Sequence, residues 1–544
     1  MKFFNKLVHT IILLTIPVFV FAQSVKNDKP AENWQNLDLQ ANGAFGISTE
    51  RAYKELLKKM KSSPIIVAVI DGGIDEEHVD LKDVMWVNTK EIPANGIDDD
   101  NNGYVDDIHG WNFIGSPKSN VHHDNVELIR MINMFNPKYA SALNSTPFNE
   151  KERKEFQLYQ KMVTEYMEEL QSAQMGFENT TMIKKYLDEI KTSLNIDNPT
   201  VEDLSAFKPS NDMQSRVIKF IKPELKDKDF TKFYEELLDN IKYYDTEIKY
   251  HLNVDFDPRK DSVGDDYSNS NERIYGNNDI TGPDAEHGTH VAGIVGAVRS
   301  NDVGIKGVAN NVKIMGVRAV PDGDERDKDV ANSIRYAVDN GAKILNMSFG
   351  KSYSWDKKVV DEAIKYAILK GVLFVHAAGN DSKNIEKEDN FPSKFYTDST
   401  GVKMGTAEAW IEVGATSWTN DEDLIATFSN WGAKTVDVFA PGVKINSTMP
   451  GSTYKENDGT SMAAPVVSGL AALIWSYYPK FTAVEIKDII MNTVTKVEQK
   501  VKINDDGDNK KVYLNEISIS GGVVNAYKAL VLADKKYAAL KGKD

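Results

Sequence analysis

The apolar positions along most of the chain form short runs separated by amphipathic stretches. The apolar or β-branched runs lie at 65–70, 312–317, 342–347 and 372–375, and the amphipathic stretches lie at 330–339 and 359–369. Strands of four to six residues that alternate with helices of about ten residues indicate βαβ units. We therefore predict an α/β fold with a central, mostly parallel sheet and helices on both faces. In such a fold the active site lies beyond the carboxyl ends of the strands.

The stretch 116–255 has a different pattern. Only Gly176 of the 35 glycines in the chain falls within it. Aromatic and aliphatic residues recur there at helical spacing among charged residues, first over 156–170 and again over 230–248. This pattern predicts a helical subdomain inserted into the sheet domain.

The N-terminus has the pattern of an export signal. Lys2 and Lys6 precede an apolar run from Ile11 to Phe21, and small Ala22 follows. The run covers about half of the roughly 20 residues that a bilayer requires, so a membrane anchor is the weaker interpretation. We predict cleavage after Ala22, export to the periplasm or the cell exterior, and no stable membrane insertion.

Together these patterns divide the chain into six segments. They are a signal peptide at 1–22, a leader with a first helix at 23–63, the two parts of the sheet domain at 64–115 and 256–530, the helical insertion at 116–255, and a C-terminal tail at 531–544.

Composition and charge exclude several classes of protein. The 544 residues are 41% hydrophobic, which allows a large core and excludes a mainly disordered chain. A net charge of −16 repels nucleic-acid backbones and anionic lipid, so no nucleic-acid partner is expected. The absence of cysteine excludes disulfides, thiolate metal sites and a cysteine nucleophile. Any covalent nucleophile must be an oxygen or an amine. The sequence leaves the oligomeric state open.

Three segments carry candidate catalytic side chains. Asp71 ends the run IIVAVID, His287 lies in GPDAEHGTHVAGIVGA, and Ser461 begins an apolar helix in DGTSMAAPVVSG. Each one alone has an ordinary structural explanation: a strand-ending turn, a buried histidine, or a helix N-cap.

In the order Asp, His, Ser, these segments resemble the subtilisin-like serine proteases. The resemblance is carried by VIDGGID at Asp71, HGTHVAG at His287, GTSMAAP at Ser461 and AAGN ending in Asn380. It implies the three-layer subtilisin-like fold and a serine endopeptidase that acts on proteins or peptides. His287 would be the general base for the Ser461 nucleophile, Asp71 would orient the imidazole, and Asn380 would stabilise the oxyanion.

The resemblance also points to substrate-binding residues. Ser348, Phe349 and Gly350 match the segment that pairs with an extended peptide, and the loop 321–329 matches another edge of the cleft. Acidic residues of that loop would favour basic substrate residues unless they are simply solvated; they are Asp322, Asp324 and Glu325. Two alternatives stay open: a non-catalytic binding or scaffold protein on the same fold, and a processing protease of narrow specificity.

Two further features could bind metals. Asp98, Asp100, Asn102 and Asp106 follow the spacing of a calcium loop, so we predict a structural calcium ion, with an acidic solvated turn as the alternative. His109 stands where an EF-hand has its glutamate. At the start of the insertion, His122 and His123 stand beside Asp124, where they would either bind a metal or face solvent.

Overall fold

The computed structural model describes residues 29–541 apart from 227, 399–401 and 506, so the predicted signal peptide lies outside the described residues. The described residues form two compact units. Met167–Lys249 make up the smaller unit, and the residues on either side of this stretch make up the larger one.

The larger unit is built on a nine-stranded sheet. Its strands, in order across the sheet, are β12 (Thr495–Lys496), β15 (Gly522–Val523), β9 (Val438–Pro441), β8 (Trp410–Thr416), β5 (Leu373–Ala377), β4 (Ile344–Met347), β1 (Ile65–Asp71), β3 (Val312–Arg318) and β2 (Gly110–Asn112). All neighbours are parallel except β12 and β15. The predicted α/β fold with a mostly parallel sheet is therefore confirmed.

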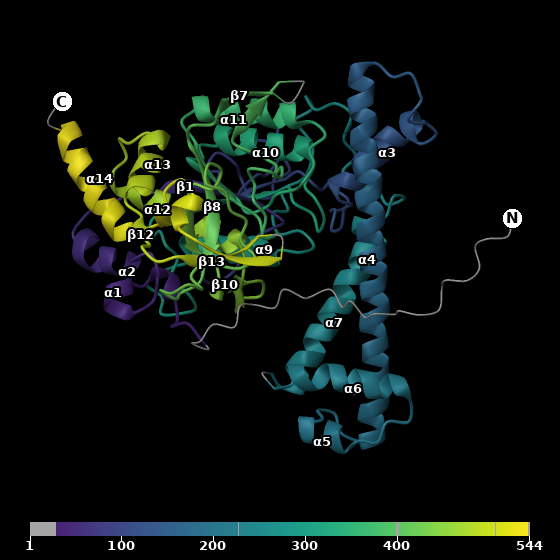
Figure 1. Cartoon of the computed structure of the whole chain (residues 1–544). Coiled ribbons are helices and arrows are strands. Elements are labelled where there is room, and N and C mark those ends of the chain that lie inside the picture. Colours follow the sequence, from purple (N-terminus) through teal and green to yellow (C-terminus); the bar gives the residue numbers. More distant parts are fainter. Residues whose placement is uncertain (1–28, 227, 399–401, 506, 542–544) are drawn as a thin grey trace. The chain divides into compact units, whose positions relative to one another are not determined.

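Helices cover both faces of this sheet (Figure 1). Alternate residues of β1 enter different cores, because successive strand side chains point to opposite faces. Val67 and Val69 join the core that contains α9 (Glu286–Gly296), α12 (Thr460–Tyr477), α13 (Ala483–Asn492) and α14 (Ala526–Lys541). Ala68 and Ile70 join the core that contains α10 (Asp327–Asp339) and α11 (Lys357–Leu369).

The central helix α12 lies inside the larger unit. It is the one helix in the described part of the chain that is long and apolar enough to cross a membrane. However, 94% of it is buried in the protein, as expected for the core helix of a layered fold. Its apolar surface is thus explained by packing on the sheet.

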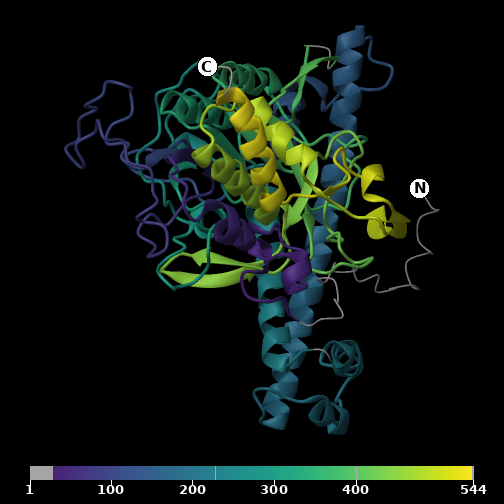
Figure 2. The same cartoon turned by 90° about the vertical axis from the view of Figure 1, so that its left-hand side faces the viewer.

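The chain ends flank this core. The predicted first helix is present as α2 (Thr49–Ala52), which continues into a π-helical turn at Tyr53–Leu57. Residues 531–541 of the predicted tail belong to α14, whose Ala533 is fully buried, and 542–544 lie outside the described residues. Figure 2 shows this yellow helix beside α13. Smaller elements of the unit are helices at Trp34–Asn36, Leu39–Asn42, Arg259–Ser262 and Leu514–Glu516, and the hairpins β6–β7 (Phe395–Thr397, Lys403–Thr406), β10–β11 (Ile445–Met449, Thr453–Asn457) and β13–β14 (Val501–Asp505, Asp508–Val512).

The predicted insertion is helical, but only its middle forms a separate unit. Its helices are α3 (Glu127–Tyr139), α4 (Glu150–Leu194), α5 (Val201–Ala206), α6 (Asp212–Glu224) and α7 (Phe230–Thr246), with a π-helical turn at Glu247–His251. Residues 116–166 and 250–255 cluster with the sheet domain, so the compact helical unit is narrower than the predicted 116–255. Within that unit, a Cβ on Gly176 would lie 2.4 Å from the Tyr244 ring, which explains the single glycine.

Candidate active site

Strand β1 ends at Asp71, which therefore lies at the carboxyl-terminal end of the sheet and contacts His287 there. Asp71 Oδ1 lies 2.7 Å from His287 Nδ1 and accepts a hydrogen bond from Gly72 N at 2.8 Å. The carboxylate is buried, with Asp71 only 3% exposed. The contact requires a glycine after the histidine, because a Cβ on Gly288 would lie 2.2 Å from Gly73 O. The structure therefore brings together two of the predicted residues.

The charges around His287 favour its protonated form. Desolvation of the ring lowers the pKa of His287, but the Asp71 carboxylate raises it through its charge and hydrogen bond, and Asp284 adds to this effect. The net result is a pKa of His287 above its ordinary value. A proton taken up by this imidazole is thus stabilised by the protein.

Ser461 lies in the first turn of α12, next to the end of β4. Its hydroxyl donates to Ser348 O at 3.1 Å, and the Ser348 hydroxyl donates back to Ser461 O at 3.0 Å. In this structure the hydroxyl therefore bonds to Ser348 and not to His287. The backbone N–H of Ser461 belongs to a helix start, where such groups lack intrahelical partners.

Asn380 follows β5 and is anchored by its carbonyl oxygen. Oδ1 accepts hydrogen bonds from Thr460 N at 2.9 Å and from Thr460 Oγ1 at 3.0 Å. Within the described residues Asn380 Nδ2 has no hydrogen-bond acceptor, so this donor is free to bind a ligand. The sequence reasoning missed Thr460, although its place directly before the candidate serine was a usable signal.

These groups meet at the carboxyl-terminal end of the sheet because β5, β4 and β1 are neighbouring parallel strands. Asp71 ends β1, Ser348 follows β4, and Asn380 follows β5. The carboxyl ends of parallel strands are where open α/β sheets place their ligand sites. The arrangement supplies a hydroxyl, an imidazole paired with a carboxylate, and two N–H donors.

Two of the three residues predicted to bind substrate, Phe349 and Gly350, have an unpaired backbone. Within the described residues, the N–H and C=O groups of Phe349 and Gly350 form no hydrogen bond. Ser348 is buried, Phe349 is half-buried, and Gly350 is exposed. A Cβ on Gly350 would lie 2.7 Å from Asn390 Oδ1, so a side chain there would crowd its neighbour. The segment thus offers a short free edge.

The carboxylates of the acidic loop 321–329 differ in exposure, because Asp322 is exposed, Asp324 is half-buried and Glu325 is buried. The expected preference for basic substrate residues therefore stays a prediction, and Glu325 is not available for it. Asp324 accepts a hydrogen bond from Glu127 N at 2.8 Å. Glu325 is 2% exposed, and burial raises its pKa to about 8. Asp322 contacts His123 and His251. The first turn of α3 and the segment before it contact this loop, because Glu127 N donates to Asp324 and Asp124 N donates to Asp322 O.

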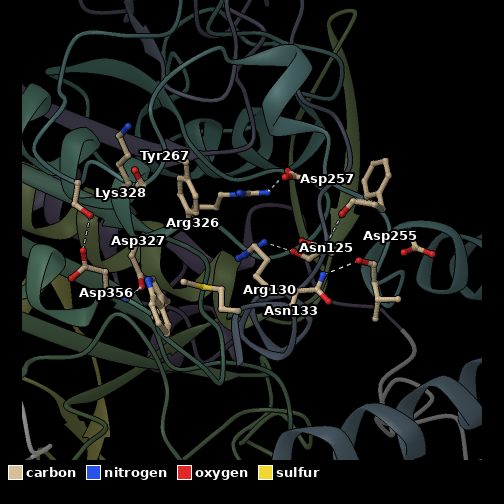
Figure 3. A pocket seen from close by; sticks show the side chains of 16 residues that line it. Asn125, Arg130, Asn133, Asp255, Asp257, Tyr267, Arg326, Asp327, Lys328 and Asp356 are labelled. Atoms are coloured by element: carbon tan, nitrogen blue, oxygen red, sulfur yellow. Dashed lines mark hydrogen bonds and ion pairs between the residues drawn. The ribbon is translucent and has the colours of Figure 1, made fainter. Parts of the chain in front are cut away.

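A pocket of about 410 Å³ lies beside the same loop (Figure 3). Its cations already have anionic partners: Arg326 pairs with Asp124 at 2.7 Å and points toward Asp257, and Arg130 pairs with Glu127. The charges lining this pocket are therefore those of an internal ion-pair network that joins α3 to the loop.

Of the four predicted calcium ligands, two lie in a carboxylate cluster and two make hydrogen bonds elsewhere. Asp98 and Asp100 lie close to Glu91, with one carboxylate oxygen from each within 4.8 Å of the others. The Asp106 carboxylate instead accepts hydrogen bonds from Asn95 N and Gly96 N, and Asn102 Oδ1 accepts one from Tyr104 N. Three clustered carboxylates are a hard-oxygen donor set that fits calcium. Sequence spacing could not identify Glu91, because it precedes the loop pattern.

Comparisons with known proteins identify relatives over much of the chain. A sequence model described as "Subtilase family" matches residues 62–511. A thermophilic serine proteinase of Bacillus sp. (strain AK1) is 40% identical over 212 residues, which are 39% of this chain and 47% of the relative. Subtilisin E of Bacillus subtilis (strain 168) is 35% identical over 215 residues, which are 39% of this chain and 51% of the relative.

Among solved structures, a protease from Pseudoalteromonas arctica is 29% identical, with a TM-score of 0.37. The match covers 46% of this chain and 74% of that one. The chain spans about half the length of the first two curated relatives that it matches.

Proposed function

Since the chain belongs to the subtilase family, we propose that it is an exported serine endopeptidase that hydrolyses peptide bonds in protein or peptide substrates. The observation that carries this proposal is the 2.7 Å contact between His287 Nδ1 and Asp71 Oδ1. This contact lies at the same carboxyl-terminal end of the sheet as Ser461 and Asn380, where a hydroxyl and an amide donor are also available.

Attack on the substrate begins with proton transfer to His287. A serine hydroxyl is a weak nucleophile at neutral pH, so an imidazole must accept its proton as the oxygen attacks the peptide carbonyl. Asp71 holds Nδ1 protonated, which leaves Nε2 as the base, and stabilises the imidazolium that forms. Ser461 Oγ first leaves its hydrogen bond to Ser348 O. His287 then returns the proton to the leaving amine, and water hydrolyses the acyl-enzyme.

Negative charge develops on the carbonyl oxygen in the transition state, and fixed donors lower the barrier. The Asn380 amide and the Ser461 backbone N–H are the two candidates. Thr460 fixes the Asn380 side chain through Oδ1, so the amide needs no reorganisation when charge develops.

The free backbone edge at Phe349 and Gly350 supports peptide binding by strand addition. A substrate paired there would place its scissile carbonyl near Ser461, which bonds directly to Ser348. Export rests on the N-terminal pattern of Lys2, Lys6 and the apolar run that follows.

The proposed activity is tested by labelling the full chain with a serine-directed fluorophosphonate, followed by cleavage-site profiling of a peptide library. Covalent labelling of Ser461 and peptide cleavage are expected. A folded protein that neither reacts with the probe nor cleaves any peptide would favour a non-catalytic protein on the same fold. The profile also separates a broad protease from one of narrow specificity.

Asn380→Leu should lower kcat by about 10²–10³ and leave KM nearly unchanged. That loss is known for removal of one such donor from a subtilisin, and the donor acts mainly in the transition state. Because the substitution also removes the acceptor for Thr460, Asn380→Asp is the matched control: it keeps an acceptor and lacks the amide donor. Full activity of Asn380→Asp would show that anchoring of Thr460 matters and the donor does not.

We also propose that Glu91, Asp98 and Asp100 bind a structural calcium ion. Chelation should then lower the melting temperature, because a ligand bound only by the folded state adds RT ln(1 + [L]/Kd), about 2.7 kcal/mol at 100 Kd. Asp100→Ala should remove the calcium dependence, whereas Asp508→Ala, at an exposed position of β14, should retain it. Equal melting temperatures of the unmodified chain with calcium and with chelator would contradict a calcium site and support the alternative of an acidic solvated turn.

A further inference from the structure

Three histidines and one aspartate from distant parts of the sequence converge within the larger unit. His122 and His123 lie at the start of the predicted insertion, His251 lies at its end, and Asp322 lies in the loop 321–329. The sequence places the first two histidines beside Asp124, but Asp124 instead pairs with Arg326 at 2.7 Å. Asp322 takes its place beside the imidazoles.

Backbone hydrogen bonds fix the three segments that carry these side chains. Asp322 N donates to His122 O at 2.8 Å, and Asp124 N donates to Asp322 O at 2.9 Å. Val126 N donates to His251 O at 3.1 Å. The convergence therefore does not depend on the side chains, and a site formed by them is preorganised by the fold.

The ligating atoms of His122, His123 and Asp322 lie close to one another, and His251 lies beside Asp322. His123 Nδ1 is 2.7 Å from Asp322 Oδ2, and His251 Nε2 is 3.2 Å from Asp322 Oδ1. One nitrogen of His122, one of His123 and one oxygen of Asp322 all lie within 4.8 Å of one another. A second carboxylate, Asp284, lies 3.9 Å from His122 Nε2.

The surroundings of His123 favour a neutral imidazole. The ring of His122 lies 3.9 Å from the ring of His123 between centroids. Burial and the His122 ring outweigh the opposing effect of Asp322 and lower the pKa of His123. The Tyr250 ring stacks on His123 at 4.1 Å and fixes its plane. A neutral imidazole is the form that binds a metal.

We propose that His122, His123, His251 and Asp322 bind one zinc ion. The close group supplies three ligands, and His251 beside Asp322 would supply the fourth by a shift of its side chain. Three imidazole nitrogens and a carboxylate are then a complete four-ligand set for zinc, whereas calcium prefers oxygen ligands. With bonds of about 2.0–2.2 Å, ligand atoms around tetrahedral zinc are about 3.3 Å apart, so His123 and Asp322 need to separate by only about 0.6 Å. The ion would join both ends of the insertion to the loop 321–329. This inference is independent of the proposed proteolysis.

The test is metal analysis of the full chain after it is stripped with a chelator, incubated with Zn²⁺ and desalted. One zinc per chain and a higher melting temperature are expected. Co²⁺ used as a probe should give the intense visible bands of four-coordinate cobalt. The double variant His122→Gln with His251→Gln should weaken zinc binding by more than the roughly 10–100-fold that loss of a supporting outer-shell partner costs.

His109→Gln is the matched control, because His109 bonds to Trp86 O outside the cluster and should not affect zinc binding. If the double variant does not fold without metal, the single His122→Gln replaces it, since that side chain is 43% exposed. Three results would overturn the proposal: no zinc retained by the unmodified chain, unchanged affinity in the folded variant, or the weak bands of six-coordinate cobalt.

Discussion

Replacement of Ser461 by alanine is expected to abolish both covalent labelling and peptide cleavage, the largest effect of any single change in this chain. Removal of the nucleophile from a subtilisin is known to lower kcat by about 10⁶, and the same loss is expected here. Fluorophosphonate labelling and turnover of a chromogenic peptide measure it directly. Persistent labelling of Ser461→Ala would show that another residue is the nucleophile.

The fold of this variant should be intact. Within the described residues Ser461 Oγ donates one hydrogen bond, to Ser348 O, and a typical hydrogen bond contributes about 0.5–1.5 kcal/mol to stability. Ser476→Ala is the matched control: it removes a buried hydroxyl from the same helix, where it bonds to Leu473 O. This control should be labelled at the normal rate. Loss of labelling in Ser476→Ala would indicate that disturbance of α12 is sufficient to explain the effect.

Asp71→Asn should lower kcat by about 10⁴, with little change in KM. An amide that donates to His287 Nδ1 leaves the ring proton on Nε2, so the imidazole cannot accept the serine proton; an Asp→Asn exchange in such a triad is known to cost about that factor. Steady-state kinetics on a chromogenic peptide measure the loss.

The pH profile separates this role from a structural one. The Asp71 carboxylate raises the pKa of His287, so its removal should lower that pKa and shift the acid limb of kcat/KM to lower pH. Asp75→Asn, in the turn after β1, should change neither kcat nor the acid limb; its carboxylate accepts hydrogen bonds from Glu77 N and Gly451 N. An acid limb at the same pH in Asp71→Asn would argue against an Asp71–His287 charge interaction in solution.

The strands and helices near the proposed active site were predictable because they follow simple periodicities. The run 65–70 became β1, and the amphipathic stretch 359–369 became most of α11. Asp71 could also be placed at the sheet edge, because a strand that ends in a polar residue before glycines presents it there. Local patterns of this kind survive in the fold since they are the patterns that build its core.

Contacts between distant segments could not be predicted in the same way. The parallel bridge between His123 and Asp322 joins residues that no periodicity relates, and it places Asp322 rather than Asp124 beside the histidines. Likewise, Glu325 belongs to a charged loop that looks solvated in sequence, but it is buried, and Arg130 of α3 and Lys351 donate hydrogen bonds to its carbonyl oxygen. Such burial depends on which surfaces meet, and a single sequence does not encode that in a local pattern.

The hydrogen bond from Ser461 to Ser348 adds a small free-energy term to the barrier of the proposed reaction. The hydroxyl must rotate away from this acceptor before His287 can take its proton, so each turnover starts from a side-chain conformation that is not yet reactive. A hydrogen bond of about 1 kcal/mol corresponds to roughly a five-fold smaller population of the reactive rotamer. A substrate that pairs with the backbone of Phe349 and Gly350 and draws Ser348 O away from the hydroxyl would release the nucleophile. Ser461 would then be least reactive while the cleft is empty, which protects it from reagents other than bound substrate.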